Sequence, residues 1–321
     1  MLTLLEESNR VEVNDIIKSE IECVISEIRN AILVDNETIL ADKILHQNMS
    51  SIVGAAENIL GGDERTILLA PSHSPSDSSL QHLMPMSEPV LSVDPIIFPG
   101  SFNPPHVGHM QLARAAINAM KKKRLDESKS RGFSSFSWED ESSPAILFEL
   151  SLTNADKPPI PREDVIKRLN GFSSMENSIL PENWGVVLTS APLFAEKVSI
   201  LSEFLPFEKE CRGTYRRLTF VIGTDTMVRI IDPKYYDGSI PNMLEALTSM
   251  KDGGVHFIVG GRVEQKKGAC GGSVVNFVDG FDELRLLPVD LQDMFTMLSE
   301  DEFRADISSS GIRALAAKQS T

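Results

Sequence analysis

The sequence predicts an α/β fold built on a doubly wound parallel sheet, with a mostly helical extension at its N-terminus. Short apolar runs alternate with amphipathic helical patterns over residues 95–321, which is the arrangement that gives parallel strands joined by crossover helices. The residues before 95 instead contain long helical patterns and then a stretch rich in Ser and Pro. We therefore expect two parts, an extension with its linker over residues 1–94 and a sheet domain over residues 95–321.

The two predicted parts differ in charge. Residues 1–94 carry 5 basic and 16 acidic side chains, a net charge of −11, whereas residues 95–321 carry 26 and 30, a net charge of −4. The formal net charge of −15 argues against a nucleic-acid partner. No apolar run is long enough to span a membrane, and no basic segment followed by an apolar one opens the chain. The composition predicts a cytoplasmic protein without membrane or nucleic-acid partners.

The extension begins with helical patterns over residues 13–33 and 37–60. It then passes into the stretch Pro71-Ser-His-Ser-Pro-Ser-Asp-Ser-Ser79, which has the composition of a linker. Residues 61–79 faintly resemble a piece of the CinA C-terminal domain, a nicotinamide-nucleotide deamidase module, and no activity or site residue is transferred from so short a match. We expect the extension to pack on the domain, to bind a protein partner, or to contact a second copy in a homo-oligomer.

The sheet domain divides into strands and helices in regular alternation. Strands are predicted where apolar runs end at turn residues, over residues 93–98, 145–150, 185–189, 217–222 and 255–259. Helices are predicted from the spacing of apolar residues over 107–124, 162–169, 192–204, 226–231 and 242–250. Residues 128–144, rich in Ser and acidic side chains, indicate a surface insertion. The cations 121–124 suit a helix C-terminus, and a nuclear-import signal is the alternative that would add a nuclear location.

The turn between the first strand and its helix predicts phosphate binding. It reads Phe98-Pro-Gly-Ser-Phe-Asn-Pro-Pro-His-Val-Gly-His-Met110. Unpaired N–H groups and the positive dipole end at a helix N-terminus attract phosphate. Gly100 allows the backbone to approach a ligand closely. His106 and His109 are three residues apart, so both imidazoles lie on one face of the helix and can contact one phosphate chain.

A second phosphate-binding segment lies near the other end of the chain, at Ile307-Ser-Ser-Ser-Gly-Ile-Arg313. Its three serines can cap a helix and offer hydroxyl and backbone donors. Arg313 falls on the first turn of that helix, where its planar guanidinium suits a phosphate. For this segment alone, a serine cap on an ordinary helix is the simpler interpretation.

Together, the two segments resemble the paired signatures of the HxGH nucleotidyltransferase superfamily. The Gly-Ser-Phe-Asn-Pro-Pro-His form is similar to nicotinamide and nicotinate mononucleotide adenylyltransferases, and residues 229–236 to a divergent eukaryotic branch of them. The resemblance implies a Rossmann-like nucleotidyltransferase fold and transfer of AMP from ATP to nicotinamide mononucleotide (NMN) or nicotinate mononucleotide (NaMN), with release of pyrophosphate, in NAD biosynthesis. It makes His106, His109 and Arg313 catalytic. It also assigns nucleotide binding to Gly100, Ser101, Phe102, Gly223, Asp225, Ser308, Ser309 and Ser310.

Two further loops resemble the segments that hold the acceptor nucleotide in those adenylyltransferases. The first, over residues 150–159, makes Asn154 and Lys157 substrate-binding, with a Pro-rich turn as the alternative. The second, over residues 188–197, does the same for Thr189 and Phe194, although a Phe at this spacing is as often a core residue. In the Gly223-Thr-Asp225 element, Asp225 can accept hydrogen bonds from ribose hydroxyls or simply cap a helix.

The implied chemistry needs little beyond positioning and charge neutralisation. The acceptor phosphate is mostly dianionic at neutral pH, since its second ionisation has a pKa of about 6, so it can attack the α-phosphorus without a strong base. We expect Mg²⁺ to arrive with ATP and to be held by the triphosphate and water, with no dedicated protein metal site. The cation Arg262, on a glycine turn, is a further candidate contact for the triphosphate. The three cysteines have no metal-binding or nucleophile spacing.

Two other functions fit the same motifs. The first keeps the fold and changes the substrates, giving a cytidylyltransferase for a small phosphorylated alcohol or a pantetheine-phosphate adenylyltransferase. The second is a regulator that binds nucleotide and has lost turnover. The acceptor-like loops favour the NAD-forming enzyme over the first, and the intact histidine pair with Arg313 favours an active enzyme over the second.

Overall fold

The computed structural model describes residues 53–72, 82–86, 95–130, 144–153, 158–205, 218–267 and 273–304, apart from single positions at 55, 60 and 63. The predicted helix over residues 13–33 and the first part of that over 37–60 lie outside these ranges. A compact unit extends from Ser51 to Thr321.

The core of this unit is one eight-stranded sheet, whose strands lie in the order β10-β7-β6-β3-β4-β5-β1-β2. Six neighbouring strands, β10 through β5, run parallel. At the β5 edge, β1 and β2 add as antiparallel strands. The predicted α/β fold with a doubly wound sheet is confirmed. The strand bounds are β1 Thr66–Ser72, β2 His82–Met86, β3 Ile96–Pro99, β4 Ile146–Ser151, β5 Trp184–Thr189, β6 Leu218–Gly223, β7 Val255–Gly260 and β10 Phe295–Met297.

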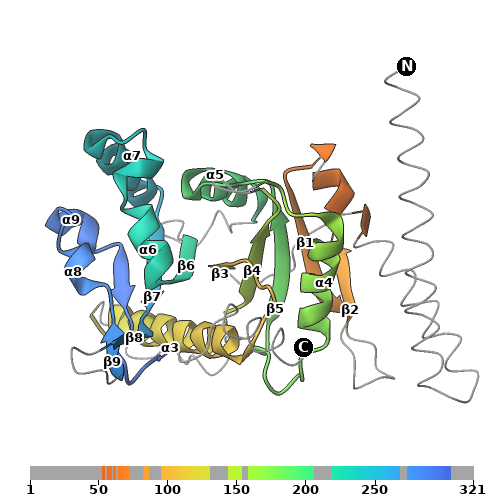
Figure 1. Ribbon diagram of the computed structural model, residues 1–321, viewed down its shortest axis with the longest axis horizontal. Helices are drawn as coiled ribbons and strands as arrows, with labels where there is room; N and C mark the ends of the chain where they lie inside the picture. The colour runs from red at the N-terminus through yellow and green to blue at the C-terminus, as the bar shows by residue number, and fades with distance from the viewer. Residues whose placement is uncertain are drawn as a thin grey trace, which may run out of the picture. The chain divides into compact units, whose positions relative to one another are not determined.

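Helices cover both faces of the sheet (Figure 1). On one face pack α3 (Val107–Ser130) and α4 (Arg162–Ser173). On the other pack α5 (Phe194–Phe204), α6 (Thr224–Ile230), α7 (Ile240–Asp252), α8 (Phe281–Leu284) and α9 (Val289–Gln292). A 3-10 turn, η2 (Pro233–Tyr235), follows α6. A separate hairpin of β8 (Arg262–Lys267) and β9 (Ser273–Val278) follows β7.

Alternation of side chains along the strands builds two apolar cores. In β3, Ile96 and Phe98 lie in the core beneath α3 and α4, whereas Ile97 lies in the core on the opposite face. Because both faces are buried, these strands read in the sequence as continuous apolar runs rather than alternating ones. All five predicted strands of the domain are present, each within three residues of its expected ends.

The connectivity places a topological switch point between β3 and β6. From β3 the chain passes outward to β4 and β5, then returns to the other side of β3 and passes outward through β6, β7 and β10. In open α/β sheets, ligands bind outside the carboxyl ends of the strands at such a point. Two segments therefore lie at this switch point. They are the turn that follows β3 and the Gly223–Asp225 element that follows β6.

Residues 66–86 differ from the prediction, which placed an extension and linker there. Thr66 to Leu69 pair with the edge of β5, and β2 pairs with β1. The apolar run 67–70 is short, and the Ser and Pro residues after it give the segment the composition of a loop. The sheet therefore extends N-terminally past the predicted boundary at residue 94. At the predicted insertion, residues 128–130 belong to α3 and residues 131–143 lie outside the described ranges.

Replacing Gly171 by Ala should destabilise the fold, although Ala favours a helix interior over Gly by about 1 kcal/mol. A Cβ at this position in α4 would lie 2.7 Å from Cδ of Pro105, and overpacking of this kind costs about 1–3 kcal/mol. We expect a net loss of about 1 kcal/mol in the free energy of unfolding, measured by urea titration. Asn170→Ala, at an exposed neighbouring position, is the matched control and should leave stability unchanged or raised. A gain in Gly171→Ala would contradict this packing.

Candidate functional site

The turn from Gly100 to His106 joins the end of β3 to the start of α3. Gly100 donates its N–H to the carbonyl of Glu149 in β4 at 3.0 Å. The ring of Phe102 then folds back over Gly100, where an added Cβ would lie 2.7 Å from the ring. Phe102 itself has a φ of +43°, and the Asn103–Pro104 peptide bond is cis. Glycine is required at position 100 because the aromatic ring occupies the space of a side chain.

The side chain of Phe102 packs in the core, and the predicted role of this residue in nucleotide binding stays a prediction. Its side chain is fully buried. The ring makes edge-on contacts with Phe98, Phe148 and Phe172, at centroid distances of 5.5, 5.5 and 5.2 Å. Only the backbone of Phe102 remains to contact a ligand. Ser101, by contrast, is exposed beside it, as its predicted role requires.

Helix α4 contacts the turn through Arg168 and Gly171. Arg168 is buried and donates from Nη1 to the carbonyl oxygen of Ser101 at 3.0 Å. Gly171 lets the helix approach Pro105 of the turn. Neither residue is predicted from the sequence, because an arginine within an amphipathic helix has no signal that distinguishes a buried position from an exposed one. The turn is thus held both by β4 and by α4.

His106 and His109 stack on each other at the N-terminus of α3. Their ring centroids lie 3.7 Å apart, with an angle of 32° between the planes. The His109 ring also contacts the edge of Phe102 at 5.0 Å. No acidic residue lies in the first turn of α3, so no carboxylate of that turn competes for its N–H groups. The predicted pairing of the two imidazoles on one helix face is present.

The hydrogen bonds of the pair define the state of His109. The backbone N–H of His106 donates to Nδ1 of His109 at 3.1 Å, so Nδ1 carries no proton and the neutral ring carries it on Nε2. Burial lowers the pKa of His109 to about 3, with a smaller contribution from His106. Burial also lowers the pKa of His106. Both rings are therefore neutral donors at physiological pH.

One ring nitrogen of the histidine pair has no hydrogen-bond partner among the described residues. Nδ1 of His106 is buried and has no hydrogen-bond partner within the described ranges. Buried polar atoms in proteins are nearly always paired, and exceptions commonly mark a place that a ligand or water fills. The imidazole pair thus has one ring fixed by the backbone and one ring with capacity for a further partner.

Asp225, after β6, and Arg262, after β7, lie on the same side of the switch point and face each other. Their side chains form an ion pair at 2.8 Å, and both are substantially exposed. Gly223 has open space beside its Cα, since a Cβ added there would have no neighbouring atom within 4 Å. The hydroxyl of Thr224 donates to the carbonyl of Gly260 at 3.1 Å, which ties the ends of β6 and β7 together. The structure thus brings Gly223, Asp225 and Arg262 to one edge of the sheet, as predicted.

Two residues predicted to hold the acceptor have side chains that make contacts within the fold. Thr189 is fully buried, and its hydroxyl donates to the carboxylate of Glu149. Phe194 packs against Phe220 and Phe257 of the core, at centroid distances of 5.6 and 5.8 Å. Phe194 is partly buried and packs against the core, the alternative that its spacing left open, and the Thr189 hydroxyl makes a hydrogen bond within the fold. Acceptor binding by these two residues stays a prediction.

The other predicted site residues lie outside the described residues. These are Asn154 and Lys157 in the loop after β4, and Ser308, Ser309, Ser310 and Arg313 in the second signature. Their roles stay predictions. Within the described part of the chain, no group of three His, Cys, Asp or Glu side chains is arranged to hold a metal ion.

Comparison with known protein families gives a match to the family described as cytidylyltransferase-like, over residues 97–125. This segment contains most of β3, the turn, the imidazole pair and most of α3. The match supports the HxGH nucleotidyltransferase superfamily and nucleotidyltransferase activity in general, without distinguishing the substrates. Curated proteins give no match to this chain. Among the helices of the described ranges, none has the length and apolar character needed to cross a membrane.

The lowered pKa of the His109 imidazole predicts a pH-dependent stability. Its pKa is about 3 in the folded protein, against an ordinary value of 6.5, so between these values the unfolded chain binds a proton that the folded chain excludes. This contribution of His109 to the free energy of unfolding is fully present above pH 6.5. It is lost as the pH falls toward 3, at up to about 1.4 kcal/mol per pH unit. Urea unfolding between pH 4 and 7 should show a steeper loss in the wild type than in His109→Gln. Parallel pH profiles would contradict a buried neutral ring.

Proposed function

We propose that this protein transfers AMP from ATP to NMN or NaMN and releases pyrophosphate, forming the dinucleotide in NAD biosynthesis. The observation that supports nucleotidyl transfer most directly is the stacked, neutral pair of His106 and His109 at the N-terminus of a 24-residue helix. A nitrogen of His106 still lacks a partner among the described residues. The assignment to the pyridine nucleotides rests on the Gly-Ser-Phe-Asn-Pro-Pro-His turn and the acceptor-like loops.

In this reaction, an oxygen of the acceptor phosphate attacks the α-phosphorus of ATP. The bond from the α-phosphorus to the oxygen bridging the β-phosphate breaks, and pyrophosphate leaves with the negative charge. Nε2–H of His109 and the ring of His106 donate hydrogen bonds to the phosphate oxygens as that charge grows. The N–H groups at the start of α3 add to this stabilisation. The substrate is Mg·ATP, whose metal is held by the triphosphate and water.

The nucleoside part of the ligand lies, in this proposal, at the ends of β6 and β7. Gly223 leaves open space for it, and the carboxylate of Asp225 accepts hydrogen bonds from ribose hydroxyls. We assign to Arg262, which pairs with Asp225 in this structure, a contact with the triphosphate. We assign to Arg313 and the serines of the second signature the remaining contacts with the phosphates, and to Asn154 and Lys157 contacts with the acceptor.

A cytidylyltransferase acting on a phosphorylated acceptor is the second candidate. The family match over residues 97–125, to a family described as cytidylyltransferase-like, is compatible with this candidate and equally with the first. The chemistry at the imidazole pair is the same for both nucleotides. The two candidates differ in the base at the β6 and β7 edge and in the acceptor.

His109→Ala should lower the rate of NAD formation on the order of 10²–10³-fold, because it removes a preorganised donor to the developing charge. Incubation of the full chain with Mg·ATP and NMN or NaMN, followed by chromatography of the dinucleotide and an assay of pyrophosphate, measures this rate. Gln111→Ala, at an exposed position on the same helix, is the matched control and should keep the wild-type rate.

Other outcomes of this assay decide between the candidates. Pyrophosphate release only with CTP and a phosphorylated alcohol would support the cytidylyltransferase. Binding of ATP without turnover of any acceptor would support a regulator. A His109→Ala variant that is folded, by circular dichroism, and retains the wild-type rate would overturn the proposed role of the imidazole pair.

A further inference from the structure

A buried ion pair lies at the carboxyl ends of β4 and β5 and has no role in the chemistry proposed so far. Glu149 is 1% exposed and Lys197, in the first turns of α5, is 6% exposed. The Lys197 ammonium lies 2.7 and 2.9 Å from the two carboxylate oxygens of Glu149. It also donates to the carbonyl of Ala191 at 2.8 Å. Each of its three protons therefore has an acceptor.

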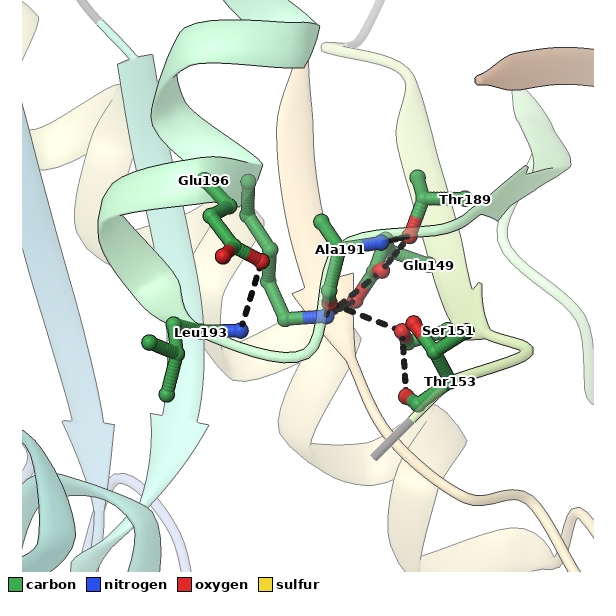
Figure 2. Close-up of polar contacts among 8 residues, drawn as sticks. Glu149, Ser151, Thr153, Thr189, Ala191, Leu193 and Glu196 are labelled. Carbon is green, nitrogen blue, oxygen red and sulfur yellow. Dashed lines mark hydrogen bonds and ion pairs between the residues drawn. The ribbon is translucent and has the colours of Figure 1, made fainter. Parts of the chain in front are cut away.

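Two hydroxyl groups extend the pair into a network (Figure 2). Thr189, at the end of β5, donates to the same Glu149 carboxylate. The hydroxyl of Ser151, at the end of β4, lies 2.7 Å from the carbonyl oxygens of both Ala191 and Thr153. The network thus joins the loop that follows β4 to the loop that follows β5.

The position of this pair is not explained by stability alone. Removing two charges from water is costly, and buried ion pairs can often be replaced by apolar residues without loss of stability. The surrounding residues of β4 and β5 are apolar and buried, so packing could hold these strands without charges. What the ion pair adds is a fixed geometry for the two loops, through directed hydrogen bonds at the sheet edge where ligands of such folds bind.

Glu149 also connects these loops to the turn that runs from Gly100 to His106. Its backbone carbonyl accepts from Gly100, the first residue of the turn, at 3.0 Å. Its carboxylate holds Thr189 and Lys197. Glu149 therefore holds the turn of residues 100–106 with its backbone, and it holds the loops after β4 and β5 with its side chain.

We infer that Glu149 and Lys197 are positioning residues. They hold the two loops after β4 and β5 at the distance from the turn of residues 100–106 that the acceptor mononucleotide requires. This inference rests on the proposed function. The ion pair does not touch the reacting atoms. It acts through the backbone of Thr153 and Ala191, and it therefore governs the use of the acceptor while leaving the use of ATP unchanged.

The double variant Glu149→Gln, Lys197→Met tests this in the full chain. It removes both charges together, so neither is left buried alone, and it keeps the lengths of both side chains. The carbonyl of Ala191 retains the Ser151 hydroxyl as a partner. We expect kcat/KM for NMN to fall on the order of 10²-fold, the effect of a misplaced reactant, chiefly through a higher KM for NMN, with KM for ATP unchanged.

Asp282→Asn, Arg285→Met is the matched control, since it neutralises an exposed ion pair. It should retain both KM values. A merely structural role for Glu149 and Lys197 would instead lower the melting temperature and kcat while leaving both KM values at wild type. That result would overturn the inference.

Amide hydrogen exchange gives a readout that does not depend on turnover. The N–H of Leu152 donates to the carbonyl of Thr189 at 2.9 Å, and the N–H of Ser190 donates to the carbonyl of Arg65 at 3.1 Å. Both residues begin the two loops, and their N–H groups should exchange on the order of tenfold faster in the double variant because the loops open locally. Unchanged exchange would overturn the inference. If the wild type fails to use NMN, the proposed function falls, and the exchange rates still decide whether the ion pair sets the loops.

Discussion

The candidate site depends on the burial of one aromatic ring, that of Phe102. The residue adopts a φ of +43°, a conformation that costs a side chain on the order of 1–3 kcal/mol. Burying the ring contributes about 1.5–3 kcal/mol, and each edge-on aromatic contact about 0.5–1.5 kcal/mol more. With three phenylalanine neighbours, the attraction exceeds the strain, so the turn is held in its unusual course.

The same ring couples the imidazole pair to the hydrophobic core. Phe102 contacts His109 on one side and Phe172 of α4 on another. His109 is thereby fixed by packing as well as by the hydrogen bond from the His106 backbone. A donor held by two independent restraints on rigid elements keeps its geometry when charge develops next to it, which is what electrostatic stabilisation requires. The neutral state of the ring follows from the same burial.

The sequence was a good guide to features with a local signal. The five central strands are apolar runs bounded by turn residues, and the histidine spacing predicts a shared helix face. The roles of Phe102, Thr189 and Phe194 needed the fold, because burial depends on partners distant in sequence. The sequence does carry a signal for Glu149, which is the single carboxylate within the otherwise apolar run 145–150. Strands β1 and β2 were missed because a short run next to Ser and Pro residues has the composition of a loop.

The charge state of the turn constrains how any polyphosphate is held. With pKa values lowered by burial, His106 and His109 supply oriented hydrogen bonds and little positive charge. The dipole of α3 supplies only a partial charge. Arg262 is already compensated in part by Asp225. In the proposed reaction, most of the neutralisation of the leaving pyrophosphate must therefore come from the Mg²⁺ of the substrate and from Arg313, while the turn contributes orientation. In the proposed reaction, this division would allow an overall acidic chain to bind a polyanion.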